Sequence, residues 1–551
     1  MKNISRIIVI SIQVVAFLLL AACPATPEST AAEPKGLTFI HMNDTYRVGA
    51  VEDGKLGGFG RVVTMIREVQ AEGREVRVLH GGDLLYPSLE SQLWNGQQMV
   101  EALNYIDALA PVYFVAGNHE FDRRTPEHLV NALHASEFDW LGDNYRFDTG
   151  DAAADALLQQ AFTFEHDGRT IGIFSLTSHV DDGGNDRDYL QVDKNYVAVA
   201  ERVIEEFESQ DVDLIIGLTH LYVATDLQVA ALREQHPTLA FVGGGHDHEA
   251  DFNEQTDSSA AVMKGASNAR AIWRVDVSFE DSGAAEIDVH MLNLGEGVAI
   301  DADYDQINQK WRARLLELYP FLEAKVGEAA FPMNATEETT RSKEIAWGNF
   351  IVDQMLTAFG EHADLAFINS GTLRIDDYIA DDITFEDIGR TFGFSSYLHY
   401  MTISGAEFRQ VMEAGYRGAG GSQGYFPQIA GFRVCVDRSR AEGQRIVSMQ
   451  LPVGDMWQEI DADAEYTLVV PEFLYGGGDG YKLPQERPVS RPGSELKYLV
   501  LDGILRAQAE GRKVGETINA TNARYVEADS GACWSAPRSA TGSRPKSYKS
   551  G

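Results

Sequence analysis

Basic residues are scarce in this chain of 551 amino acids: 46 lysines and arginines stand against 83 aspartates and glutamates, for a net charge of −37. So acidic a surface repels phosphate backbones, which argues against a protein that binds nucleic acid through a basic face. After the first 20 residues no apolar run is long enough to cross a membrane. Glycine and proline show no period typical of a fibre, and the 44% hydrophobic content is too high for a disordered chain.

Cysteine is also scarce, and the first of the three lies in a processing signal. Basic residues precede an apolar stretch of signal-peptide length, and small residues stand directly before Cys23. This resembles a bacterial lipobox, whose cysteine is acylated; an ordinary signal peptide cut elsewhere is the alternative. We expect a signal peptide over 1–22, a tether over 23–36, and an exported protein held by a lipid on Cys23 at the periplasmic side of the outer membrane or at the cell surface. Cys435 and Cys533 could pair in an oxidising compartment, but the sequence leaves this open.

From residue 37 to about 300, short apolar runs alternate with segments that are apolar at helical spacing, such as 61–70 and 197–209. This alternation predicts an α/β sheet domain. The predicted strands are Leu37–His41, Val76–His80, Val112–Val115, Ile171–Leu176, Leu214–His220 and Leu239–Val242.

The rest of the chain divides into three predicted parts. Residues 301–325 are amphipathic and predict a connecting helix. Residues 326–528 predict a second α/β domain, and 529–551, rich in Ser, Gly, Arg and Lys, predict a disordered tail. At roughly 100–200 residues per domain, the length is sufficient for two domains of this size.

Polar side chains gather where the predicted strands of the first domain end, which is where an open α/β sheet places its ligand site. One such residue would be weak evidence, since Asp44 could be a helix cap and His220 an ordinary histidine. Together they are hard to explain as caps. They are Asp44, Asp83, Asn118, His119, Asp122, His220, His246 and His248.

Carboxylate, imidazole and amide groups together are typical ligands of borderline divalent cations, whereas calcium prefers oxygen cages. The absence of cysteine from the set disfavours structural zinc. Two metal ions about 3.5–4 Å apart can share one carboxylate, activate a water and bind the oxygens of a phosphoryl group. The pattern therefore predicts phosphate ester chemistry.

These motifs resemble the calcineurin-like metallophosphoesterases, and with the second domain the chain resembles the bacterial 5′-nucleotidase / UDP-sugar hydrolase family over about residues 37–525. The resemblance implies a four-layer α/β-sandwich dinuclear metallophosphoesterase domain over 37–300 and a nucleotide-binding α/β domain over 326–528. It implies two divalent ions, Mn, Zn, Mg or Co. Asp83 would bridge them. The remaining implied roles are Asp44 and His248 on the first metal, Asn118, His220 and His246 on the second, and His119 with Asp122 as the catalytic pair.

One departure concerns the first metal. The family's first motif usually reads Asp-x-His, whereas here Tyr46 follows Asp44 and Thr45. Tyr46 could ligate, water could take the place, or that metal could bind weakly. A further alternative is Tyr86, because Gly82-Asp83-Leu84-Leu85-Tyr86 resembles the iron-binding motif of purple acid phosphatases. The competing interpretation is that Tyr86 is an ordinary aromatic residue in a loop.

In the second domain, Asn369 and Arg374 resemble the family's Asn-Gly-Gly-x-x-Arg, and an arginine fork suits phosphate or ribose oxygens. A surface Arg374 that pairs locally is the alternative. Phe426 and Tyr481, with Asp479 nearby, match aromatic positions that would sandwich a base, unless Phe426 is core. Where the family reads Pro-Phe-Gly-Asn this chain has Thr391-Phe392-Gly393-Phe394, which removes an amide from the substrate site.

The expected function is metal-dependent hydrolysis of nucleoside 5′-monophosphates to nucleoside and phosphate by an activated water. Hydrolysis of UDP-sugars or of 2′,3′-cyclic nucleotides on the same site is one alternative. A nucleotide-binding surface protein that has lost turnover is another, encouraged only by Tyr46. We expect a nucleotide as partner, no nucleic-acid polymer, and a monomer or dimer.

Overall fold

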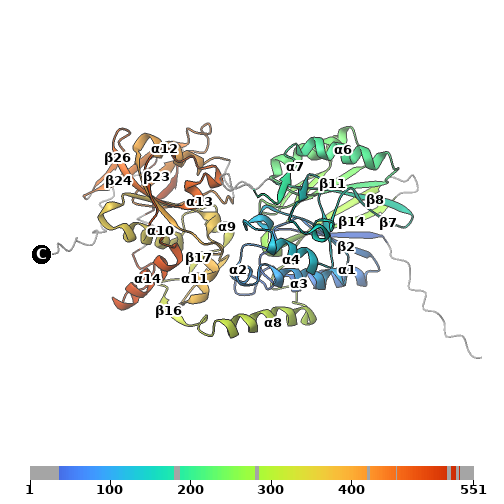
Figure 1. The fold of residues 1–551 in the computed structure, drawn as a ribbon, viewed down its shortest axis with the longest axis horizontal. Coiled ribbons are helices and arrows are strands. Elements are labelled where there is room, and N and C mark those ends of the chain that lie inside the picture. Colours follow the sequence, from blue (N-terminus) through green and yellow to red (C-terminus); the bar gives the residue numbers. More distant parts are fainter. Residues whose placement is uncertain are drawn as a thin grey trace, which may run out of the picture.

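The computed structural model describes residues 36–178, 187–279, 285–418, 422–454, 456–517 and 523–528, and residue 533. These residues form two lobes that lie side by side (Figure 1). The predicted signal peptide, the lipidation site Cys23, nearly all of the tether and most of the predicted tail lie outside the described residues. Within the described ranges, no helix has the length and apolar character needed to cross a membrane.

The first lobe is built on two sheets. One has the order β15-β14-β1-β2-β3-β4-β6 and the other the order β12-β13-β11-β10-β8-β7. The strands of the first sheet are β15 (Ala285–Asn293), β14 (Ala271–Phe279), β1 (Leu37–Met42), β2 (Glu75–His80), β3 (Val112–Val115), β4 (Asp139–Leu141) and β6 (Leu158–Gln159). Those of the second are β12 (Asp251–Asn253), β13 (Ala261–Lys264), β11 (Leu239–Gly244), β10 (Leu214–His220), β8 (Arg169–Thr177) and β7 (Phe162–His166).

Helices cover the outer face of each sheet, so the lobe has four layers (Figure 1). The central strands β1 and β10 are buried along their whole length, as expected of parallel strands covered on both faces. The helices beside the first sheet are α1 (Phe59–Ala71), α3 (Gln97–Asp107) and α4 (Glu127–Ala135), and those beside the second are α6 (Tyr196–Glu208) and α7 (Val223–Ala230). The predicted fold class, a four-layer α/β sandwich, is confirmed.

The predicted strands all exist, and each differs from the observed strand by at most two residues at either end. The predicted helices 61–70 and 197–209 correspond to α1 and α6. What the alternation did not show is the division into two sheets. That division follows from packing, because the inner faces of both sheets share one apolar core that contains Phe39 of β1 and Phe241 of β11.

Helix α8 (Ala302–Leu318) follows the first lobe and runs along the lower edge of the molecule (Figure 1). It packs on α1 and α3, and Trp311 and Leu315 are buried on that side. Leu318, which ends the helix, is exposed. The chain then enters the second lobe at β16 (Lys325–Glu328).

The second lobe contains a five-stranded sheet of order β22-β18-β26-β21-β27 and a four-stranded sheet of order β25-β24-β23-β28. Apolar cores lie on both sides of the five-stranded sheet. Its strands are β22 (Pro427–Ala430), β18 (Leu365–Asn369), β26 (Glu465–Pro471), β21 (Leu398–Ser404) and β27 (Val489–Ser490). The four-stranded sheet has β25 (Met456–Glu459), β24 (Ile446–Val453), β23 (Arg433–Val436) and β28 (Tyr525–Glu527). The helices are α9 (Glu337–Thr340), α10 (Ala346–Phe359), α11 (Phe385–Thr391), α12 (Gly405–Ala414), α13 (Glu472–Tyr475) and α14 (Leu496–Ala509).

Cys435 on β23 and Cys533 are joined by a disulfide, with their Cα atoms 5.5 Å apart. The pairing that the sequence left open is therefore present in the structure. Because β28 pairs with β23, the bridge attaches the chain just beyond the last described strand to the sheet that this strand completes.

Candidate metal centre and substrate cleft

The carboxyl ends of five strands from both sheets meet at the centre of the first lobe, and they carry the polar residues that the sequence singled out. Asp44 follows β1, Asp83 follows β2, and Asn118 follows β3. His220 ends β10, and the segment after β11 carries two more histidines, His246 and His248. Residues more than 200 positions apart thus share one site, and acidic and imidazole groups of Asp44, Asp83 and His220 come within 4.8 Å of one another.

One half of this site is formed by Asn118, His220 and His246. The Asn118 Oδ1 atom lies 3.1 Å from His220 Nε2 and 2.9 Å from His246 Nδ1, and the two ring nitrogens are 3.2 Å apart. The Nδ1 of His220 lies 2.6 Å from the carbonyl of Gly81, so it donates there and leaves a lone pair on Nε2. Burial lowers the pKa of both His220 and His246, which keeps the rings uncharged. Lone pairs that converge in this way fit a cation.

The other half is formed by Asp44, Asp83, His248 and Tyr46. The Tyr46 hydroxyl lies 3.2 Å from Asp44 Oδ1, 3.0 Å from Asp83 Oδ2 and 2.9 Å from His248 Nε2. His248 Nε2 is itself 3.1 Å from Asp44 Oδ1. A phenol has one proton and can satisfy only one of these acceptors. The oxygen and nitrogen atoms of these four side chains thus converge, and there are too few protons to join all of them by hydrogen bonds. Such a set of lone pairs also fits a cation.

Asp83 faces both halves. Its Oδ2 lies against Tyr46, while Oδ1 is 3.4 Å from His220 Nε2 and accepts a hydrogen bond from the His119 backbone. Burial raises the pKa of Asp83 to about 8; His119 opposes the shift and Asp44 adds to it. Burial alone would raise the pKa of Asp44 as well, but His248 holds it well below its usual range. The two carboxyls therefore differ strongly in the metal-free protein.

The backbone at the site is unusual. Asp44, Asp83, His246 and His248 all have positive φ angles, between 51° and 83°, a region that non-glycine residues rarely adopt. Such conformations persist only where the surrounding structure enforces them, and they cluster at functional sites. Space is also limited at Gly117, since a Cβ there would lie 2.1 Å from Asp83 Oδ1.

Two buried charged residues hold the ligand-bearing loops in place. The Glu120 carboxylate accepts hydrogen bonds from the backbone of Asp83, Leu84, Leu85 and Gly117, at 2.6–3.0 Å. Lys264 lies between Asp226 and Asp247, 2.8 Å from each, and donates to the carbonyl of Gly245. Neither residue could be assigned a role from the sequence, because most of their partners become neighbours only in the folded protein.

His119 lies beside this centre and is shared by both lobes. Its Nδ1 is 3.0 Å from both carboxylate oxygens of Asp122, the residue that the family resemblance pairs with it. Arg374 of the second lobe places Nη2 3.0 Å from His119 Nε2. Since a guanidinium can only donate, His119 Nε2 accepts a hydrogen bond from Arg374. The ring proton is then on Nδ1, which donates a hydrogen bond to Asp122. Among the described residues, the buried Nη1 of Arg374 has no hydrogen-bond partner.

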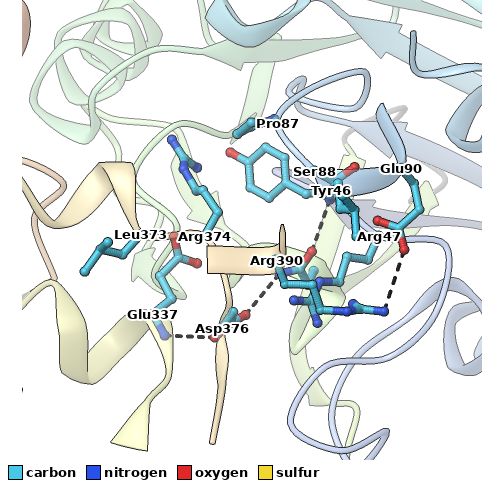
Figure 2. A pocket seen from close by; sticks show the side chains of 12 residues that line it. Tyr46, Arg47, Pro87, Ser88, Glu90, Glu337, Leu373, Arg374, Asp376 and Arg390 are labelled. Atoms are coloured by element: carbon cyan, nitrogen blue, oxygen red, sulfur yellow. Dashed lines mark hydrogen bonds and ion pairs between the residues drawn. The ribbon is translucent and has the colours of Figure 1, made fainter. Parts of the chain in front are cut away.

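Arg374 also lies over the rings of Tyr46 and Phe394, at 5.4 and 5.3 Å from their centroids. Figure 2 shows it extending from the second lobe toward Tyr46. It is therefore part of the site and not an isolated surface charge. Phe394, which takes the place of the family's asparagine, stacks near His119 with 5.6 Å between ring centroids.

Tyr86 does not reach the metal centre. Its hydroxyl donates to Asn95 Oδ1 at 2.8 Å, and its ring packs beneath the Arg123 guanidinium. The structure thus does not bring Tyr86 together with the other candidate ligands, and of the two tyrosines only Tyr46 faces them.

A cleft of about 1100 Å³ extends from this centre between the lobes. Asn369, Arg374 and Asp479 line it, and Asn369 Nδ2 donates to Asp479 Oδ2 at 2.7 Å. Phe426 and Tyr481 do not: their side chains are 2% and 0% exposed and belong to an apolar core of the second lobe. The expectation that these two rings sandwich a base is corrected here.

Other aromatic rings line the cleft instead, on both lobes: Tyr196, Tyr222, Phe394, Tyr425, Phe473 and Tyr475. Phe473, on α13, is 37% exposed, and its ring lies on the glycine-rich turn that carries Asp479. A Cβ on Gly478 would come within 2.5 Å of that ring. Glycine at this position therefore leaves the space that the Phe473 ring occupies.

Two family models match this chain. Residues 37–250 match the calcineurin-like phosphoesterases, and residues 324–486 match the 5′-nucleotidase C-terminal domain. A trifunctional nucleotide phosphoesterase of Bacillus subtilis is 25% identical over 507 residues, which is 84% of this chain and 33% of that protein. The chain thus spans one third of that relative. The 5′-nucleotidase of Mus musculus is 22% identical over 85% of this chain and 87% of its own.

Solved structures show the same fold. The 5′-nucleotidase precursor of Thermus thermophilus superposes with a TM-score of 0.74 at 21% identity, covering 89% of this chain and 99% of that one. The sulfate thiohydrolase of the same organism superposes with a TM-score of 0.67 at 15% identity, covering 90% and 97%.

Proposed function

Because this chain belongs to the 5′-nucleotidase family of phosphoric ester hydrolases, with a calcineurin-like phosphoesterase domain and a 5′-nucleotidase C-terminal domain, we propose that it hydrolyses nucleoside 5′-monophosphates to nucleoside and phosphate. One observation carries the proposal. His119 and Asp122 lie beside a cluster of six candidate metal ligands, and Arg374 of the other lobe reaches the same histidine.

The family implies divalent metal ions, and the donor atoms fit two. Asn118, His220 and His246 with Asp83 would hold one, and Asp44, His248 and Tyr46 with Asp83 the other. The Tyr46 hydroxyl would then take the place of the family's histidine. When bound, such ions neutralise phosphoryl charge and generate a nucleophile from water. Manganese, zinc, magnesium or cobalt would suit the nitrogen-containing set, and iron would suit a phenolate.

The protein's own groups position the substrate. We assign the Arg374 guanidinium, with its unpartnered Nη1, to the phosphate or the ribose oxygens, since a planar fork suits such groups. When substrate takes the Arg374 fork, His119 Nε2 is freed to take up a proton from solvent and to donate it to the leaving oxygen. Asp122 holds the ring orientation throughout. Asn369 and Asp479 form a polar pair on the wall of the cleft that suits ribose hydroxyls.

Hydrolysis of substrates of different class tests this function, with the organic products separated by chromatography as well as inorganic phosphate measured, because UDP-glucose and cyclic nucleotides are cleaved without releasing inorganic phosphate. The protein without residues 1–35 is stripped of metal, reloaded with Mn²⁺ or Zn²⁺, and assayed with AMP, UDP-glucose and a 2′,3′-cyclic nucleotide. Metal-dependent release from AMP is the expected result. Preferred cleavage of UDP-glucose or of the cyclic nucleotide would assign the site to one of those alternatives. Tight nucleotide binding without release would indicate a binding protein.

We propose that Phe473 stacks on the base. Replacing it with alanine is expected to raise KM for AMP by about 5- to 150-fold, because a base–aromatic stack is worth ~1–3 kcal/mol. Hydrolysis of ribose 5-phosphate, which has no base, should be unaffected. The matched control is Phe426→Ala, which should lower the melting temperature, since Phe426 is core. A variant of Phe473 with unchanged KM for AMP would remove the residue from the base site.

Export and lipid attachment stay a proposal based on the sequence before residue 36. The lipobox-like residues that end at Cys23 support it. Mass spectrometry of the N-terminal peptide from a bacterial membrane fraction is expected to show a diacylglycerol on Cys23. A mature chain that begins at another residue without lipid would contradict it.

A further inference from the structure

Glu337 belongs to the second lobe, yet its carboxylate contacts residues of the first lobe. It begins helix α9 and is 7% exposed. Its Oε1 is 2.7 Å from Nδ1 of His248, and its Oε2 accepts a hydrogen bond from the Ser267 hydroxyl. Arg270, also of the first lobe, lies 3.5 Å from Oε2. Figure 2 shows Glu337 in the pocket between the lobes, together with Arg374 and Tyr46.

The second lobe fixes the orientation of this carboxylate. Arg341, one helical turn further along, places Nη2 2.6 Å from Oε1. The Glu337 backbone N–H donates to Asp376 Oδ1 at 2.8 Å, and Asp376 in turn accepts from Asn268 of the first lobe at 3.0 Å. Contacts within the second lobe thus orient the Glu337 carboxylate toward His248.

This contact determines which nitrogen of His248 faces the metal centre. A carboxylate paired with Arg341 accepts, so Nδ1 of His248 donates to Glu337, and Nε2 is the nitrogen that faces Asp44 and Tyr46. A carboxylate behind a ligating imidazole fixes the ring and increases its basicity. Glu337 performs this role from outside the lobe that contains the ligand.

The second histidine site is supported differently. His220 Nδ1 is fixed by the carbonyl of Gly81, which is part of the same lobe. The half of the centre with Asn118, His220 and His246 is therefore self-contained. The half with His248 is completed across the interface between the lobes.

We propose that Glu337 is a positioning residue that couples the first metal site, formed by Asp44, Tyr46, Asp83 and His248, to closure of the two lobes. This rests on the proposed function in one respect, the assignment of those residues as metal ligands. When the lobes separate, His248 loses the group that fixes its ring, and the first site weakens while the second is unaffected. By linkage, a metal in the first site stabilises the closed arrangement by the same free energy.

The test is metal affinity, measured site by site in the full mature chain without nucleotide. Titration calorimetry with Mn²⁺ gives two binding steps, which His248→Ala and His246→Ala assign to the first and second site. In Glu337→Gln the first-site affinity is expected to fall about 10- to 100-fold, the usual cost of removing such a partner, with the second step unchanged. Glu338→Gln is the matched control, because Glu338 neighbours it on α9 but is exposed.

Small-angle scattering supplies a second readout. Adding Mn²⁺ is expected to shift the wild-type chain toward its compact form, and this shift should be reduced in Glu337→Gln. Unchanged first-site affinity in that variant, or equal weakening of both sites, would overturn the proposal. If Glu337→Gln does not fold, Glu337→Asp keeps the charge for Arg341 and Arg270 but withdraws the carboxylate from His248, and selective loss of the first step is again expected. Absence of AMP hydrolysis together with a selective first-site effect would contradict the proposed function alone.

Discussion

Replacing His119 with alanine is expected to lower kcat for AMP by about 10²- to 10⁴-fold, the usual contribution of a positioned acid–base group. The residue lines the cleft, and its side chain contacts Asp122, Arg374, Tyr46, Phe394 and, at 3.9 Å, the Asp83 carboxylate. Metal content and thermal stability should therefore change little. Metal analysis and single-turnover assays of phosphate release separate these effects.

Asp122→Asn provides the graded control. It keeps the shape of the side chain but removes the carboxylate that fixes the His119 tautomer, so kcat should fall by less than in His119→Ala while KM is retained. If His119→Ala hydrolysed AMP at the wild-type rate, the proton for the leaving oxygen would have to come from another group, and the assignment of this pair would be wrong.

The second large effect is expected for Asp83→Asn, which is nearly isosteric and removes a carboxylate whose two oxygens face the two halves of the metal centre. Hydrolysis should fall by about 10³-fold or more, because a catalytic metal ion supplies several kcal/mol of transition-state stabilisation. Calorimetry should show both binding steps weakened, in contrast to the selective effect predicted for Glu337→Gln.

The same residue predicts the pH dependence. Burial raises the pKa of Asp83 to about 8 without metal, so a metal ion must displace a proton below that pH. Apparent affinity is expected to rise about tenfold per pH unit up to pH 8 and then level off. Between the ordinary carboxyl pKa, about 4, and about 8, the folded metal-free state binds more protons at this site than the unfolded state. Its stability therefore decreases as pH rises through that window.

Melting temperatures of the metal-free protein between pH 5 and pH 8.5 measure this slope. Asp83→Asn cannot titrate, so it should show a shallower decrease than the wild type, and the difference isolates Asp83 from other groups. Metal affinity that does not change over this pH range would show that Asp83 is already ionised in the metal-free site.

The strand-end rule could be applied to the sequence because it depends on local features. An apolar run predicts a buried strand, and a polar residue just after it lies at the edge where parallel strands meet. Asp44, Asp83, Asn118, His220 and the two histidines after β11 are all brought together in this way. The pairing of His119 with Asp122 came from the family resemblance, and the structure places the two side chains in contact across one turn of 3₁₀ helix.

The aromatic residues of the second lobe could not be assigned in the same way. Glycine-rich turns lie beside Phe426 and Tyr481, yet both rings are buried in the core. The cleft is lined instead by Tyr425, next to Phe426, and by Phe473, eight residues before Tyr481. Which of two adjacent rings faces inward depends on the register of β22 and on packing against β18, neither of which is visible in the composition of a turn.

Contacts between residues far apart in the sequence could not be predicted either. Glu337 lies in an acidic segment before α10, 89 positions after His248, and no sequence pattern connects the two residues. Only the contact between the lobes brings them together. Tyr46 was recognised as a departure, but only the structure shows that its hydroxyl lies within 3.2 Å of three candidate ligands.

The left-handed backbone at Asp44, Asp83, His246 and His248 has a consequence for how this protein can change. Each such residue costs about 1 kcal/mol or more in the folded state, and asparagine or glycine would relieve part of that cost while removing a ligand. Selection for heat resistance alone would therefore favour variants that have lost the metal centre. Thermostability and turnover conflict at these four positions, so any search for a more robust enzyme has to screen for both.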